Sequence, residues 1–251
     1  MPQPDLRPLR AVAVEVAAEW GVELGERFAL ARYSYVAAAG ARAVLKVVPP
    51  DDDEADEEAD ALGLWNGDGA VRLLRHDRSR RALLLERARP GDDLSTLAED
   101  EATAVAVELG ARLWRPARAP FRSIHEHVPR WLADAAEHPL APLARALYAR
   151  LPKRADMLVH GDFHHHNVLL SERGWLAIDP KPMLGEPEFD VASFLWNPLP
   201  YRMRVDVTEH RLAAFAAAGL DERRMREWAV IRGAYLGADA DEIEVLRYLV
   251  S

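Results

Sequence analysis

Residues 157–190 read MLVHGDFHHHNVLLSERGWLAIDPKPMLGEPEFD, and we expect this stretch to decide the fold. Its short apolar runs alternate with polar residues, which predicts three short strands: Met157–Val159, Val168–Leu170 and Trp175–Ile178. The turn sequence Ser-Glu-Arg-Gly separates the last two runs, so we expect these two to pair as a hairpin. The strands would then hold the polar loop His160–Asn167 on a rigid base.

Three side chains in this stretch carry oxygen atoms near the ends of the predicted strands. Asp179 leaves the last strand beside Asn167 if the hairpin forms as predicted. A carboxylate and an amide oxygen suit Mg²⁺, which prefers hard oxygen ligands and keeps water and substrate phosphates in its other positions. Asp162, earlier in the loop, is then left to accept a proton from an attacking hydroxyl. This pattern is typical of a phosphoryl-transfer site.

The same residues carry a family resemblance. The triplet His160-Gly161-Asp162, with Asn167 five positions after the Asp and Asp179 downstream, resembles the catalytic and metal-binding loops of the protein-kinase-like fold. The continuation from residue 178 to residue 190, IDPKPMLGEPEFD, is similar to the streptomycin 6-kinase and hydroxyurea phosphotransferase group of the aminoglycoside phosphotransferases.

The resemblance implies an α+β, bilobal protein-kinase-like fold. Residues 1–88 would form an N-lobe with an N-terminal helix and a small antiparallel sheet, and residues 89–251 a mainly helical C-lobe. It also implies that Asp162 orients or deprotonates the acceptor hydroxyl, while Asn167 and Asp179 bind the metal. His160 is expected to support the loop.

Three consecutive histidines, His164–His166, raise a different hypothesis, a hydrolase with a transition metal. Histidine is the commonest ligand for such ions. Three consecutive side chains do not easily converge on one ion from an extended loop, so we favour loop histidines that are solvated or hydrogen-bonded.

Composition limits the classes of function. The 251 residues suffice for one large domain or two small lobes, and the net charge of −9 argues against non-specific nucleic-acid binding while it allows a cationic substrate. The absence of cysteine excludes disulfides, thiolate metal sites and thiol nucleophiles. No apolar run reaches membrane-spanning length, so we predict a cytoplasmic protein without membrane contact. We expect a monomer or a homodimer.

The N-terminal part is expected to hold the nucleotide. Apolar residues at helical spacing predict a helix that ends near Gly21, and the period then changes to that of strands. The expected strands are Phe28–Leu30, Tyr35–Ala39, Ala43–Val48, Val71–Leu74 and Ala82–Glu86.

Lys46 lies on an apolar strand face, and by resemblance it is the lysine that contacts the α- and β-phosphates of ATP. Glu58 shares the buried face of the following helix with apolar residues at i+3, i+4 and i+7, and an inward carboxylate needs a cation. We therefore expect Glu58 to pair with Lys46, with Glu54 and Glu57 as less favoured substitutes.

The segment between the first two strands has no glycine, unlike the usual nucleotide loop of this fold. Ser34 is expected to donate to a phosphate and Arg32 to supply charge, while the backbone of Glu86 to Ala88 would meet the adenine. A nucleotide-binding protein that has lost catalysis therefore remains an alternative. Lys181 is either a phosphate contact or an ordinary loop lysine.

Helical patterns fill the rest of the chain. They cover Leu97–Leu113, Trp131–Ala136, Leu143–Leu151, Val191–Trp196, His210–Gly219, Asp221–Leu236 and Asp239–Tyr248. Asp190 is expected either to cap its helix or to brace the catalytic loop. Glu186, Glu188 and Asp190 are the acidic candidates for contact with a cationic acceptor.

Together these features predict an ATP- and Mg²⁺-dependent small-molecule kinase. By resemblance its acceptor is an alcohol of a streptomycin-like aminoglycoside, or hydroxyurea, and antibiotic resistance is the implied role. A kinase for a sugar or another metabolite is the alternative within the same fold.

Overall fold

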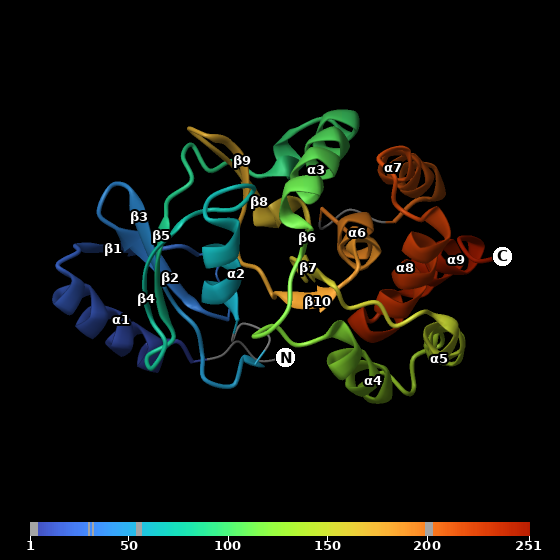
Figure 1. Ribbon diagram of the computed structural model, residues 1–251, viewed down its shortest axis with the longest axis horizontal. Coiled ribbons are helices and arrows are strands. Elements are labelled where there is room, and N and C mark those ends of the chain that lie inside the picture. Colours follow the sequence, from blue (N-terminus) through green and yellow to red (C-terminus); the bar gives the residue numbers. More distant parts are fainter. Residues whose placement is uncertain (1–4, 30, 32, 54–56, 199–202) are drawn as a thin grey trace. The chain divides into compact units, whose positions relative to one another are not determined.

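The computed structural model describes residues 5–29, 31, 33–53, 57–198 and 203–251 (Figure 1). The chain divides into two compact units, one formed by residues up to Asp92 together with Leu169–Ile178, the other by Asp93–Val168 and Asp179–Ser251. No helix in the described part of the chain has the length and apolarity needed to cross a membrane.

The first unit is built on an antiparallel sheet with the strand order β1-β2-β3-β5-β4. Its elements are α1 (Arg7–Trp20), β1 (Leu24–Arg27), β2 (Tyr35–Ala39), β3 (Ala43–Val47), α2 (Glu58–Trp65), β4 (Leu73–Asp77) and β5 (Ala82–Glu86). The predicted hairpin, β8 (Val168–Ser171) with β9 (Gly174–Ala177), is confirmed.

Helix α1 covers one face of this sheet (Figure 1). Its buried stripe, which includes Ala13 and Val16, packs with inward-facing residues of the strands such as Ala37 and Leu45. The helix ends as predicted, because Gly21 adopts a left-handed conformation and its N–H caps the last turn. Burial of the apolar stripe therefore fixes α1 on the sheet.

Two predicted strands are misplaced. The first strand is Leu24–Arg27 and not Phe28–Leu30, of which Leu30 lies outside the described residues. It is a sheet edge with three exposed residues, so it lacks the apolar alternation that marks a strand. The strand predicted at Val71–Leu74 begins only at Leu73, because the N–H of Val71 bonds instead to Ala177 O at 3.0 Å.

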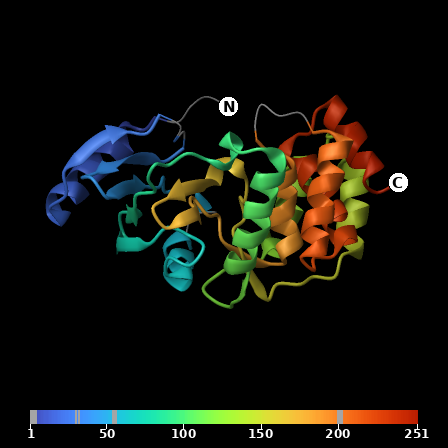
Figure 2. The same cartoon turned by 90° about the horizontal axis from the view of Figure 1, so that it is seen from above.

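The second unit is mainly helical. It contains the 3₁₀ turns η2 (Leu94–Thr96) and η3 (His165–Asn167) and the helices α3 (Glu99–Leu113), α4 (Ile124–Asp134), α5 (Ala141–Arg150), α6 (Pro187–Leu195), α7 (Val205–Ala217), α8 (Glu222–Leu236) and α9 (Ala240–Tyr248). A small antiparallel sheet has the order β10-β7-β6, with β6 (Arg115–Pro116), β7 (Met157–Val159) and β10 (Met183–Gly185). Helix α8 packs against α5, α6 and α7, and helices of this unit run side by side in Figure 2.

Four helices, α4 to α7, begin earlier than predicted. Helix α4 starts at Ile124, because Ser123 and Glu126 form a capping box ahead of the apolar pattern near Trp131. Helix α6 starts at Pro187, so Asp190 lies inside the helix and the prediction that it caps it was wrong.

Candidate active site

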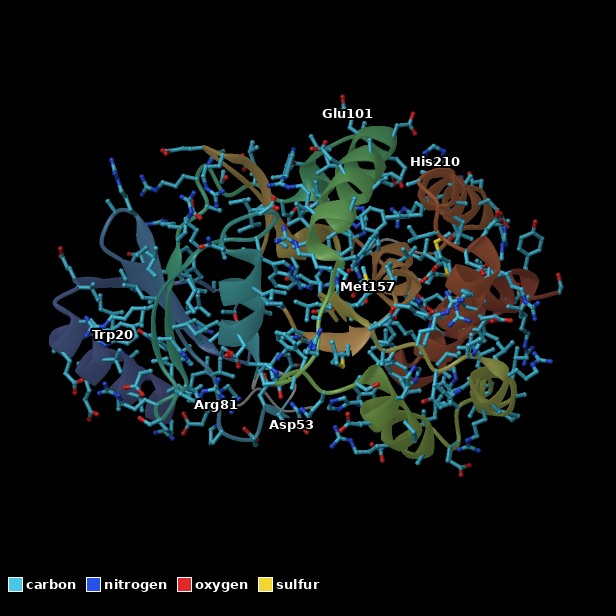
Figure 3. All side chains as sticks on the ribbon, viewed as in Figure 1. Trp20, Asp53, Arg81, Glu101, Met157 and His210 are labelled. Carbon is cyan, nitrogen blue, oxygen red and sulfur yellow. The ribbon has the colours of Figure 1, made fainter. Side chains whose placement is uncertain are left out.

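The loop predicted to be catalytic, residues 160–167 and here called the catalytic loop, begins directly after β7, whose first residue, Met157, is labelled in Figure 3. Lys181 N donates to His160 O at 2.8 Å, which holds the backbone just before β10 close to the loop. Gly161 has a φ of +82°, and a Cβ built there would lie 1.9 Å from Lys181 O. Only glycine permits both this backbone conformation and this close approach.

Asp190 braces the same loop from α6. It is fully buried, and its two carboxylate oxygens accept from His160 N at 2.7 Å and Gly161 N at 2.8 Å. Trp114 Nε1 donates to it at 2.9 Å. Burial raises the pKa of Asp190, while His160 and these donors act in the opposite direction. The predicted brace is therefore confirmed, and contact of Asp190 with an acceptor is excluded by its burial.

Asp162 keeps part of its carboxylate accessible, with 40% of its side chain exposed. Asn167 Nδ2 donates to Asp162 O at 2.9 Å and to Asp162 Oδ2 at 3.1 Å, and His160 Nδ1 accepts from Asp162 N at 3.3 Å. Burial alone would raise the pKa of Asp162, but the nearby His164, Arg232 and His160 lower it well below its usual range. Asp162 is therefore ionised at neutral pH.

Asp179 follows β9 by two residues and is exposed. Its φ of 55° is left-handed, a conformation that few residues other than glycine adopt and in which Asp and Asn are enriched. Strained backbone of this kind clusters at functional sites. Asn167, by contrast, is buried, and its hydrogen bonds engage the amide nitrogen.

The three consecutive histidines point to three different partners. His164 Nε2 lies 3.4 Å from Asp162 Oδ2, and His166 Nδ1 lies 2.8 Å from Asp93 Oδ2. The buried ring of His165 stacks on Phe194 at 4.2 Å. Among the residues that the structure describes, no group of three or more His, Cys, Asp or Glu side chains is placed to hold a metal ion. The geometry therefore favours loop histidines over a histidine metal site.

The predicted pair of Lys46 and Glu58 is confirmed in the first unit. Lys46 Nζ donates to Glu58 Oε2 at 2.6 Å, and 5% and 1% of the two side chains are exposed. Lys46 lies on β3, a central strand, and Glu58 begins α2. Glu57 is also buried but does not form this ion pair, and Glu54 lies outside the described residues.

The other residues predicted to contact the nucleotide lie next to β2 and β5. Ser34 lies in the bend between β1 and β2, and Arg32 lies outside the described residues. The side chain of Glu86 accepts two hydrogen bonds from Arg173, at 2.8 and 2.6 Å, and its backbone N–H donates to Arg72 O at 2.9 Å. Ala88 follows the end of β5 and is half-buried.

Two acidic acceptor candidates, Glu186 and Glu188, make structural contacts. Glu186 is buried and pairs with Arg224, while Trp228 Nε1 donates to it at 2.5 Å. Glu188 is also buried and accepts from Asp221 N at 3.1 Å. Both carboxylates join α6 to α8 and its N-terminus. They also line a pocket together with Lys153 and Arg154, so their contact with a cationic acceptor stays a prediction.

Sequence reasoning missed Arg232. This buried residue of α8 donates to Gly161 O through both terminal nitrogens, at 3.3 Å each. The one signal in the sequence is a charged residue within an apolar helical run, Trp228–Ala234. A buried charge of this kind must be paired or hydrogen-bonded, but the sequence does not identify the partner.

Residues 29–243 match the model of the family described as aminoglycoside/hydroxyurea antibiotic resistance kinase. The chain belongs to this family. The resemblance carried by the catalytic loop and by residues 178–190 is thereby confirmed.

Two relatives named as a phosphotransferase and a kinase are 38% and 36% identical to the chain. A hydroxyurea phosphotransferase from Kitasatospora aureofaciens is 38% identical over 214 residues, which cover 78% of this chain and 62% of the relative. A streptomycin 3''-kinase from Klebsiella pneumoniae is 36% identical over 208 residues, 75% of this chain and 76% of the relative. The match thus spans less than two thirds of the Kitasatospora protein.

The fold of this family member is similar to that of a solved aminoglycoside phosphotransferase, APH(2'')-IIa, in its ternary complex with streptomycin and ATP. The TM-score is 0.60 at 13% identity, and the match covers 100% of this chain and 99% of the other. This likeness concerns the fold, and it confirms the predicted kinase-like α+β class.

Proposed function

We propose that the chain is an ATP-dependent kinase that transfers the γ-phosphoryl group to a hydroxyl of a streptomycin-like aminoglycoside or of hydroxyurea. The observation that carries the proposal is the braced loop in which Asp162 stays partly exposed and Asn167 is fixed against it. The names of the two relatives, a hydroxyurea phosphotransferase and a streptomycin kinase, support these two acceptors.

Asp162 is the proposed catalytic residue. The acceptor oxygen forms a bond to the γ-phosphorus, the bond from that phosphorus to the bridging oxygen of ADP breaks, and the hydroxyl proton passes to Asp162. Because its pKa is lowered, Asp162 is a weak base at neutral pH. Its main contribution is therefore to orient the hydroxyl, since phosphoryl transfer depends on positioning and charge stabilisation.

Asn167 and Asp179 are the proposed Mg²⁺ ligands. The hydrogen bonds of Asn167 use its nitrogen, so its amide oxygen is the atom that would bind a cation. Asp179 is an exposed carboxylate. Two hard oxygen ligands fit an ion that takes its other ligands from water and phosphate. When bound, Mg²⁺ would neutralise charge on the β- and γ-phosphates.

The first unit supplies the proposed nucleotide contacts. Lys46, held by Glu58, would contact the α- and β-phosphates, and the ion pair fixes the direction of the ammonium group. Ser34 would donate to a phosphate, and the backbone of Glu86 to Ala88 would meet the adenine.

An ADP-release assay with streptomycin, hydroxyurea and amino sugars tests the proposal, with mass spectrometry of the phosphorylated product. Turnover with streptomycin or hydroxyurea is the expected result. Turnover with amino sugars alone would favour a metabolite kinase. Binding of ATP and Mg²⁺ without turnover on any acceptor would favour a nucleotide-binding protein without catalysis.

The substitution Asp162→Asn tests the catalytic role. We expect kcat to fall by roughly 10²- to 10⁴-fold, because asparagine neither orients the hydroxyl as a carboxylate does nor accepts its proton, while ATP binding by calorimetry is kept. Asp156→Asn is the matched control, because Asp156 is exposed at the other end of β7. Unchanged turnover in Asp162→Asn would rule out the assigned role.

A further inference from the structure

Arg232 is a buried cation without the usual partner. Only 5% of the residue is exposed. Two other buried arginines, Arg211 and Arg224, form ion pairs with Glu99 and Glu186. Within the described residues, no carboxylate forms an ion pair with Arg232. Since a buried charge is costly unless it is paired or hydrogen-bonded, other groups must stabilise the Arg232 guanidinium.

The guanidinium of Arg232 is held between aromatic rings. Its central carbon lies 4.3 Å from the ring centroid of Phe189 and 5.8 Å from that of Tyr235. Trp131 packs on Tyr235 at 5.0 Å, and His127 stacks on Trp131 at 5.3 Å. The rings of Phe189 and Tyr235 stabilise the cation through their π faces and fix the plane of the guanidinium, and Trp131 and His127 support Tyr235.

That fixed guanidinium points its donors at the residue before Asp162. Both terminal nitrogens of Arg232 lie 3.3 Å from Gly161 O, while Gly161 N is held by Asp190. Both backbone polar groups of Gly161, its N–H and its C=O, are therefore hydrogen-bonded to buried side chains. Because the peptide unit is planar, fixing the carbonyl of Gly161 also fixes the nitrogen of Asp162. The positive charge of Arg232 also contributes to the lowered pKa of Asp162.

We propose that Arg232 is a positioning residue, which holds the Gly161–Asp162 peptide so that the Asp162 carboxylate is presented to the acceptor hydroxyl. The inference rests on the proposed function and deepens it. Arg232 does not contact the reacting atoms. It acts through the backbone of the catalytic loop, with the aromatic rings as its support.

The substitution Arg232→Lys tests this role. Lysine keeps the positive charge but loses the planar pair of donors and the flat face that stacks on the rings. A misplacement of about 1 Å at a reacting group costs roughly 100-fold in rate. We therefore expect kcat with streptomycin and ATP to fall on the order of 10²-fold, while KM for ATP stays within about twofold because Lys46 and the metal ligands are untouched.

Arg224→Lys is the matched control. Arg224 lies two turns earlier on α8 and is also 5% exposed, but its partner is Glu186 and not the catalytic loop. Thermal denaturation should show lower stability for both variants, and only Arg232→Lys should lose kcat per folded molecule. If Arg232→Lys does not fold, Arg232→Gln, which keeps one donor group, replaces it.

Isotope labelling gives a readout that does not depend on turnover. Protein labelled with ¹³C′-glycine and ¹⁵N-aspartate yields one cross-peak for each Gly-Asp pair, at Gly67-Asp68, Gly91-Asp92 and Gly161-Asp162. In Arg232→Lys only the carbonyl shift of Gly161 should change, because only that carbonyl accepts from Arg232. An unchanged Gly161 shift would overturn the inference.

The possible outcomes separate the two proposals. A wild-type chain without turnover on any acceptor overturns the proposed function and this inference with it. An active wild-type chain whose Arg232→Lys variant keeps kcat within about threefold overturns the inference alone. An equal loss of kcat in Arg224→Lys also overturns it, because general destabilisation would then explain the effect.

Discussion

Replacement of Gly161 by alanine should disable the catalytic loop. The added Cβ would lie 1.9 Å from Lys181 O, whereas real contacts of this kind are essentially never below 3.0 Å. The two backbone segments must therefore separate by at least about 1 Å. Lys181 cannot move alone, because its N–H is bonded to His160 O.

The expected magnitudes follow from this displacement. A left-handed alanine costs about 1–2 kcal/mol of unfolding free energy, and overpacking of the backbone adds about 1–3 kcal/mol. A shift of about 1 Å beside Asp162 should lower kcat on the order of 10²-fold. Gly237→Ala isolates the backbone term, since its φ of +84° is nearly that of Gly161 and nothing lies within 4 Å of its added Cβ.

Urea denaturation and the ADP-release assay measure the two effects. Gly237→Ala should lose about 1–2 kcal/mol and keep its kcat. Gly161→Ala should lose more stability and nearly all turnover. If Gly161→Ala retains kcat within about threefold of Gly237→Ala, then the close approach of Lys181 does not govern the position of the catalytic carboxylate.

Two further predictions concern the first unit. Glu58→Gln leaves Lys46 buried without its carboxylate, so urea denaturation should show a loss of about 3–5 kcal/mol in the free energy of unfolding. Asp60→Asn removes a surface ion pair and should cost under about 1 kcal/mol. Equal losses in the two variants would contradict the stabilising role of the buried pair. The hydrogen bonds from Arg173 lower the pKa of Glu86 in the folded protein. The ionised Glu86 carboxylate therefore stabilises the fold above the ordinary glutamate pKa, and this stabilisation is lost as pH falls through the lowered pKa. The stability difference between wild type and Glu86→Gln should therefore shrink in acid, and a difference independent of pH would contradict this account.

Local geometry made part of the site predictable from sequence. Strand alternation placed Lys46 on a defined face, and helical spacing turned Glu58 inward, so their pairing followed from two local periods and the need of a buried carboxylate for a cation. The loop from His160 to Asn167 was recognisable because its residues are consecutive and follow a short apolar strand. Turn residues likewise predicted the hairpin of β8 and β9.

Contacts between distant segments required the tertiary structure. Asp190 meets His160 N across 30 positions, and Arg232 meets Gly161 O across 71, so no local pattern links either pair. Glu186 was expected at an acceptor because its charge is visible in the sequence, but its partner Arg224 on α8 is not. Short-range spacing in the sequence was enough to predict the groups that we propose to carry the chemistry. Only the packing of α6 and α8 decided which charged residues hold those groups in place, because burial and partners depend on the whole fold.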